Sequence, residues 1–160
     1  MAKSIKVNLG TIMVCCSVLF GLAAFFMMFA PAVSGEGKII GTAPVYSGAQ
    51  VIFGYSENDT AILNFNFLAF LGLFLLPLGG VICACASLFT GNKALSYVAA
   101  VVFVVGAVLA FFTVASFKSG VASGTFYDLY NWKLAVGPIL SGIFGAVAGC
   151  LIAGKEILKK

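Results

Sequence analysis

Residues 61–92 read AILNFNFLAFLGLFLLPLGGVICACASLFTGN, a stretch in which no side chain carries a charge. A helix needs about 20 apolar residues to cross the roughly 30 Å of a bilayer's hydrocarbon core. Residues 7–35, 94–117 and 134–154 form three more charge-free stretches of sufficient length. The chain is therefore predicted to be an all-α integral membrane protein. We expect a bundle of four transmembrane helices over about residues 7–30, 61–89, 94–117 and 134–153.

The composition fits a membrane protein. The chain is 62% hydrophobic and only 9% charged, whereas a soluble domain is about a quarter charged. We interpret residues 1–160 as one membrane domain. The uncharged run from Val7 to Ala30 is longer than the apolar core of a signal peptide, so the first helix is expected to be retained.

The lysine residues predict the orientation, because lysines that flank a span are retained on the cytoplasmic side. With the N-terminus inside, the inner lysines are Lys3, Lys6, Lys93, Lys155, Lys159 and Lys160, and the outer ones are Lys38, Lys118 and Lys133. This bias predicts a multi-pass protein of the cell membrane with both termini in the cytoplasm. The net charge of +4 follows from that topology and does not indicate a nucleic-acid partner.

The predicted loops differ in length and composition. The outer loops cover residues 31–60 and 118–133, and the inner loop, 90–93, is a tight turn. In the first outer loop, β-prone pieces at residues 38–40, 45–46 and 50–53 alternate with Gly and Pro. This pattern predicts a small extracytoplasmic β-hairpin or meander. Pro77, near the middle of the second span, predicts a helix kink.

This layout resembles that of claudin-type tetraspans, which have a longer first outer loop with strands, a tight inner turn and a shorter second outer loop. The first outer loop of that family carries a Trp, a Gly-Leu-Trp element and two cysteines. Residues 33–59 of this chain contain neither Trp nor Cys. The resemblance therefore implies the layout alone, and no family residue or role in junctions or channel regulation is carried over.

Small residues recur at every fourth position of the fourth span. In lipid, this spacing lets a second helix backbone approach closely. The partner is the first span, which offers Ser17 and Gly21, or else a second copy, another membrane protein or a neighbour in an oligomeric pore. The stripe consists of Gly137, Ser141, Gly145, Gly149 and Ala153.

The residue types that usually carry catalysis are scarce. The sequence has no His and no Arg, so the usual general base and the usual phosphate-binding fork are missing. The predicted spans contain no Asp, Glu or Lys either, which argues against an ion-coupled transporter. The five cysteines fall in the inner halves of the spans, and we interpret them as packing residues, with lipidation or a metal site as alternatives. No enzymatic activity, metal or cofactor is predicted.

These exclusions favour a non-enzymatic tetraspan protein that acts as a structural or accessory subunit of a larger membrane assembly. Its expected partners are the lipid bilayer and other membrane protein subunits or further copies of itself. A homo-oligomeric pore or small-solute facilitator is the alternative, and a lipid-handling protein is a third option. The use of Lys without Arg, and the many Phe and Ile residues, fit an AT-rich bacterial genome.

Aromatic residues of the outer loops are the expected contacts for an external partner. An interfacial belt of Tyr and Trp at the membrane surface is the alternative interpretation for the second outer loop. The predicted contact residues are Tyr46, Phe53, Tyr55, Phe126, Tyr127 and Tyr130.

Overall fold

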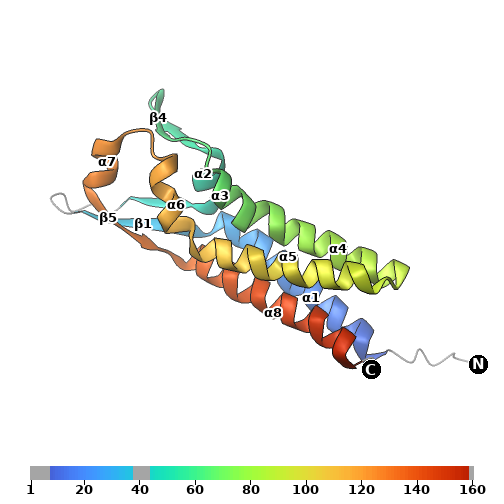
Figure 1. Cartoon of the computed structure of the whole chain (residues 1–160). Helices are drawn as coiled ribbons and strands as arrows, with labels where there is room; N and C mark the ends of the chain where they lie inside the picture. Colours follow the sequence, from blue (N-terminus) through green and yellow to red (C-terminus); the bar gives the residue numbers. More distant parts are fainter. Residues whose placement is uncertain (1–7, 38–43, 159–160) are drawn as a thin grey trace, which may run out of the picture.

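The computed structural model describes residues 8–37 and 44–158. Four helical segments in this part of the chain are long and apolar enough to cross a membrane (Figure 1). They confirm the prediction of a multi-pass, mainly helical membrane protein. The segments are Leu9–Phe29, Phe67–Thr90, Lys93–Phe111 and Val136–Leu158.

Each segment is built from one or more helices. The first is α1 (Leu9–Phe26), which ends in a 3₁₀ turn, and the second joins α3 (Phe67–Phe70) to α4 (Leu76–Thr90) through a π-helical turn. The third is α5 (Lys93–Phe111), and the fourth is α8 (Val136–Leu158).

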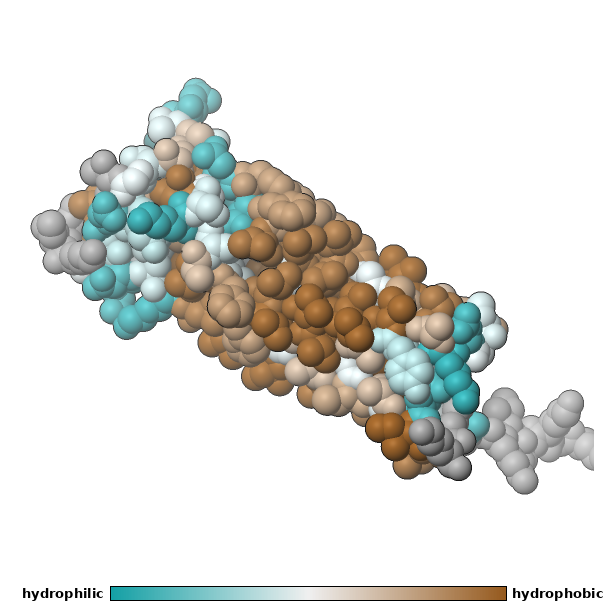
Figure 2. All heavy atoms as spheres, viewed as in Figure 1, coloured by the Kyte–Doolittle hydropathy of each residue, from teal (hydrophilic) through white to brown (hydrophobic). Residues whose placement is uncertain are grey.

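The four segments form an antiparallel bundle in which α1 and α5 each pack against both α4 and α8. The start of α1, the α4–α5 turn and the end of α8 lie at one end of the bundle, which we call the turn end (Figure 1). The remaining segments form a folded unit at the opposite end, which we call the cap. Figure 2 shows hydrophobic residues over the middle of the bundle and hydrophilic residues at both ends. This distribution matches a bilayer around the middle of the helices.

The ring of Phe103, on α5, fills the centre of the bundle and is 1% exposed. Gly21 of α1 and Gly80 of α4 both face this ring. A Cβ atom placed on either glycine would lie 2.6 Å from a carbon of the Phe103 ring. Two glycines on two helices therefore provide the space for one large side chain from a third.

The turn between α4 and α5 confirms the tight loop predicted at residues 90–93. Gly91 ends α4 with φ 66°, in the left-handed region that glycine adopts without strain. Its N–H donates to the carbonyl of Ser87 at 3.0 Å. The side chain of Asn92 then accepts a hydrogen bond from the N–H of Ala94 at 2.9 Å and caps the start of α5.

The cap contains a three-stranded antiparallel sheet in the order β2-β1-β5. Strands β1 (Pro31–Gly37) and β2 (Val45–Ser47) come from the first outer loop, and β5 (Tyr130–Leu134) comes from the second. A separate hairpin pairs β3 (Tyr55–Glu57) with β4 (Thr60–Leu63). Short helices α2 (Gly48–Phe53), α6 (Thr113–Gly120) and α7 (Gly124–Asp128) complete the cap.

The predicted hairpin or meander within the first outer loop is correct only in part. The piece at residues 45–46 is a strand, but the piece at 50–53 is helical, because Ser47 and Gln50 form a capping box that starts α2. The central strand β1 also pairs with a strand from the other loop, which local sequence pattern does not reveal. The predicted piece at residues 38–40 lies outside the described residues.

The second span begins later than predicted. Residues 61–63 belong to β4, and the helix starts at Phe67 because the Asn66 side chain accepts a hydrogen bond from the N–H of Ala69 at 3.1 Å. Asn66 is 2% exposed and also donates to the carbonyl of Ser116 on α6 at 2.8 Å. This contact ties the start of the second segment to α6 of the cap.

Two irregular positions interrupt the predicted helices. A π-helical turn, Leu71–Leu75, ends just before Pro77, where the sequence predicts a kink. Proline has no N–H with which to continue the α-helical hydrogen bonds. The π-helical turn, which is wider than an α-helical one, accordingly lies within one helical turn of Pro77. The predicted third span breaks at Phe112, where α5 ends and α6 continues into the cap.

The glycine beside the Phe103 ring offers a test of this packing. Replacing Gly80 with Ala should lower the free energy of unfolding by about 1–3 kcal/mol, because the added methyl group overlaps the buried ring. Gly79 is the matched control, since a Cβ atom there would lie 3.9 Å from its nearest neighbour. Reversible unfolding in detergent micelles would measure both variants, and equal stabilities of Gly80→Ala and Gly79→Ala would contradict the packing.

Candidate functional site

An aromatic cluster at the centre of the cap joins the two outer loops. Trp132 of β5 contacts every other member, with ring centroids separated by 4.7 Å from Phe117, 5.4 Å from Tyr130 and 6.2 Å from Tyr46. Contacts at these separations are typical of favourable aromatic pairs. The aromatic cluster consists of Tyr46, Phe117, Phe126, Tyr127, Tyr130 and Trp132.

Two local features position Trp132. In the pairing of β1 with β5, Trp132 lies opposite Gly35, and a Cβ atom on that glycine would lie 3.0 Å from the indole ring. The missing side chain leaves room for the indole on that face of the sheet. The indole N–H also donates to the carbonyl of Tyr127 at 2.9 Å, so the polar atom of the ring is satisfied.

Tyr46 is the most deeply buried tyrosine of the aromatic cluster, with 8% of its surface exposed. Burial raises the pKa of Tyr46 above its ordinary value of 10.0, and the negative charge of Glu57 raises it further. The side chain is therefore a neutral packing group at physiological pH. The aromatic cluster contributes flat apolar area and hydroxyl groups to the packing of the cap.

The aromatic residues predicted to contact a partner mostly pack against one another. Tyr46 is buried, and Phe126, Tyr127 and Tyr130 are half-buried within the aromatic cluster. Tyr55 is half-buried against Tyr46, with ring centroids 6.0 Å apart. Phe53 is the exposed member of the predicted set, at 53%. Partner contact by these residues stays a prediction, and most of their ring surface supports the cap from within.

The sequence prediction did not include Trp132 among the site residues. Trp132 alternates with Tyr130 and Leu134 in a period of two, and all three are half-buried while Asn131 and Lys133 between them are exposed. That alternation is the signal of a strand with one packed face, and it could have identified both β5 and its central residue.

The stripe on α8 is covered within the chain. Gly145 and Gly149 face α5, where an added Cβ atom would lie 3.3 Å from the carbonyl of Phe103 and 3.2 Å from that of Ala100, respectively. Gly137 lies against the backbone of residues 27–31 instead. Ser141 is also buried, and Ala153 is half-buried. The stripe thus packs against two neighbours in its own bundle, so little of it is open to a second chain.

The residues predicted on the first span also lie inside the bundle. The hydroxyl of Ser17 donates to the carbonyl of Ala148 on α8 at 2.8 Å, which ties α1 to α8. Gly21 packs against Phe103 of α5 and Val81 of α4. The two residues therefore serve different contacts.

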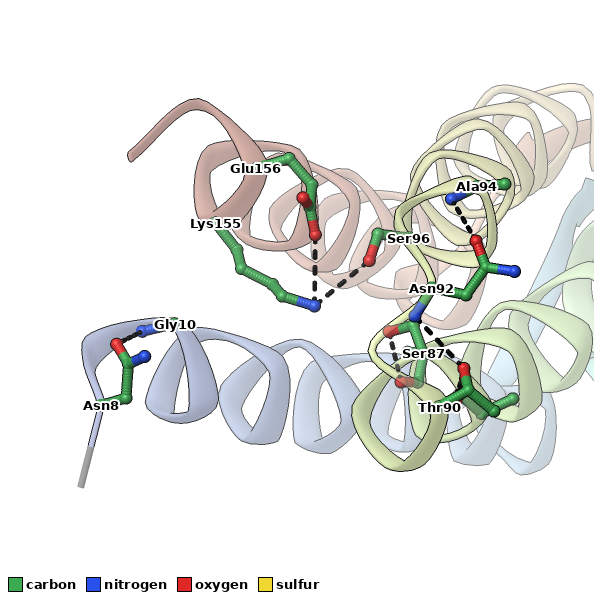
Figure 3. Close-up of polar contacts among 11 residues, drawn as sticks. Asn8, Gly10, Ser87, Thr90, Asn92, Ala94, Ser96, Lys155 and Glu156 are labelled. Carbon is green, nitrogen blue, oxygen red and sulfur yellow. Dashed lines mark hydrogen bonds and ion pairs between the residues drawn. The ribbon is translucent and has the colours of Figure 1, made fainter. Parts of the chain in front are cut away.

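A buried ion pair lies at the turn end, just beyond the predicted end of the fourth span at residue 153. Helix α8 continues to Leu158, past the predicted end of the span, and buries Lys155 and Glu156, each 5% exposed. The ammonium of Lys155 lies 3.2 Å from a carboxylate oxygen of Glu156 and donates to the hydroxyl of Ser96 on α5 at 3.2 Å (Figure 3). Opposite charges at this distance offset part of the cost of burying each of them.

The buried face of α8 carries the signal for this pair. Ala148 and Ile152 are buried, and Lys155 and Glu156 continue their spacing of three and four residues. The helical period therefore places both charges on the packed face. The sequence prediction ended the span at Ala153 because it treated charge as the boundary.

Within residues 8–37 and 44–158, no group of three or more His, Cys, Asp or Glu side chains is placed to hold a metal ion. The five cysteines are free thiols on α1, α4 and α8.

Comparison with known protein families and with curated proteins finds no match for this chain.

Substitution of Trp132 tests whether the aromatic cluster holds the cap together. Trp132→Ala should destabilise the cap by about 3–5 kcal/mol, and Trp132→Phe, which keeps a ring but loses the hydrogen bond, by about 1 kcal/mol. Limited proteolysis of reconstituted protein would show faster cleavage between residues 44 and 66. Leu129→Ala, at a residue that is 38% exposed, is the control, and equal cleavage of the Ala variants would contradict the role of Trp132.

The raised pKa of Tyr46 predicts a pH dependence. Above about pH 10, Tyr46 in the unfolded chain loses its proton while the folded residue keeps it, so the stability of the cap should fall. Below that pH the contribution of Tyr46 to stability is fully present. Tyr46→Phe should reduce the loss at high pH and change stability near neutral pH by less than about 1 kcal/mol. Denaturation followed by the fluorescence of Trp132, the single tryptophan, would detect the difference, and identical pH profiles would exclude it.

Proposed function

We propose that this chain is a non-enzymatic membrane protein that acts as a structural or accessory subunit of a larger membrane assembly. In this proposal the cap contacts the other subunits of the assembly, and the bundle anchors the cap in the bilayer. The stripe on α8 is not the docking surface in this proposal, because its residues are covered within the chain.

The folded cap is the observation that carries the proposal. Antiparallel helices need only short connections, yet both outer loops form one unit with a shared sheet and aromatic cluster. Val45 on β2 and Leu129 beside β5 are apolar and remain 54% and 38% exposed in that unit. A preformed surface loses little conformational entropy on binding, so it is suited to recognising another protein.

The polar surface of the cap supports the same proposal. Lys133 of β5 and Glu36 of β1 form an exposed ion pair at 2.6 Å across the two strands. An exposed pair contributes little stability, but it fixes the position of two charges on the surface. An apolar contact area with a polar rim is typical of protein interfaces.

The packed centre of the bundle favours this proposal over a pore within one chain. Phe103 occupies the middle, and Gly145 and Gly149 close the space between α8 and α5. A conducting path would therefore have to run between copies of the chain. Lysine distribution supports an orientation with the turn end in the cytoplasm and the cap outside. The use of Lys without Arg supports a bacterial cell membrane.

Site-specific photo-crosslinking in cells tests the proposal. A crosslinking amino acid at Val45 or Leu129 should give adducts with another polypeptide, identified by mass spectrometry. Val101, which is 61% exposed in the middle of α5, is the matched control and should react with lipid. Protein adducts at Val101 but not at the two cap positions would refute contact through the cap.

A permeability measurement on liposomes distinguishes the proposal from the pore alternative. Purified protein alone should leave liposomes impermeable to ions and small solutes under the proposal, because its bundle is packed. Selective permeability that scales with protein content would replace the accessory-subunit proposal with an oligomeric pore.

A further inference from the structure

A polar cavity opens at the turn end beside the buried ion pair. Its volume is about 90 Å³, several times the space that a single buried water needs. The wall includes Asn8, Gly10 and Thr11 at the start of α1, Ser87 near the end of α4 and Lys155 of α8. Asn8 and Thr11 are exposed, so the cavity is accessible from the surface of the turn end.

We propose that this cavity binds the phosphate group of a phospholipid headgroup. Among the side chains that form the wall, Lys155 is charged and none is acidic. Lysine is a common ligand of phosphate, which it binds as a point charge. The cavity therefore favours an anion over a cation.

Lys155 is held in place and retains capacity for a ligand. An ammonium group has three N–H donors, and the described residues supply two acceptors, Ser96 and Glu156. In Figure 3 the Lys155 side chain points from α8 into the space between α1 and the α4–α5 turn. Lys155 also lines the cavity, so in this proposal its third donor binds the ligand there. Glu156 keeps the pair neutral, so the bundle does not depend on a bound anion to bury this lysine.

The start of α1 adds a second favourable element on the opposite wall. This helix has 18 residues, and its first turn carries a partial positive charge of about half an elementary unit. Gly10 and Thr11 of that first turn line the cavity together with Lys155. Their N–H groups already donate to Asn8, at 3.2 Å to its side chain and 2.8 Å to its carbonyl, so this helix end contributes its partial charge and not a free donor. A helix terminus and a buried ammonium therefore face one pocket from two elements.

The surroundings favour a lipid over free phosphate. Ser87 lies three residues before the end of α4, about 4.5 Å from that end along the helix axis. A bilayer that covers the apolar part of the bundle would place its headgroups at this level. Leu88, which follows Ser87 on α4, also lines the cavity and is 36% exposed. An exposed apolar side chain in the wall of a phosphate-binding cavity matches a ligand that carries both a phosphate and acyl chains.

Native mass spectrometry of the detergent-purified protein titrated with phosphatidylglycerol tests the proposal. The double variant Lys155→Met/Glu156→Gln removes the ammonium without leaving a buried carboxylate unpaired, and it should weaken lipid retention at least about tenfold. Lys133→Met/Glu36→Gln is the matched control, because it removes an exposed pair of the same residue types at the other end. It should change retention by less than about twofold.

A second variant keeps the test decisive if the first one misfolds. Thr11→Trp places a bulky side chain at an exposed position of the cavity wall, keeps the ion pair and should also weaken retention. Phosphatidylglycerol retention equal to that of the unaltered protein, in either variant with native circular dichroism, would overturn the proposal. Equal retention of diacylglycerol, which lacks phosphate, would do the same. Binding of inorganic phosphate without retention of the lipid would overturn the headgroup as the ligand.

Discussion

The packing of the bundle depends on one buried aromatic ring, which occupies the space beside two glycines. Phe103 of α5 lies against Gly21 of α1 and Gly80 of α4, and this contact sets how closely three helices approach. In lipid there is little hydrophobic drive between helices, so close packing and a few hydrogen bonds must supply the association energy. The hydrogen bond from Ser17 to the carbonyl of Ala148 adds such a link between α1 and α8.

Two groups of side chains, one aromatic and one polar, lie at opposite ends of the bundle. At one end, pairing of β1 with β5 joins loops from distant parts of the chain into a cap around Trp132. At the other, Lys155, Glu156 and Ser96 form a buried polar group beside a cavity. We propose a protein partner in water for the cap and a lipid phosphate at the membrane surface for the turn end. The two proposed contacts are thus separated by the length of the bundle.

Particular residues show which features of the structure could be predicted from the sequence and which could not. Gly91 and Asn92 have strong local preferences, so the tight turn could be predicted from them. Residues 50–53 have strand propensity, but the capping box at Ser47 and Gln50 makes them helical. Lysine and glutamate at the end of a span look like a solvated tail, and only the packed face of α8 shows that Lys155 and Glu156 are buried.

The sequence by itself determined that four helices are apolar enough to span a membrane and that a tight turn connects the second to the third. These features follow from composition and from local backbone preferences, which act within a few residues. The tertiary structure decided that Gly145 packs on α5, that Trp132 meets Gly35, and that the aromatic residues of the outer loops pack against one another. Those contacts join residues far apart in the chain, and their geometry exists only after the helices and strands have packed together.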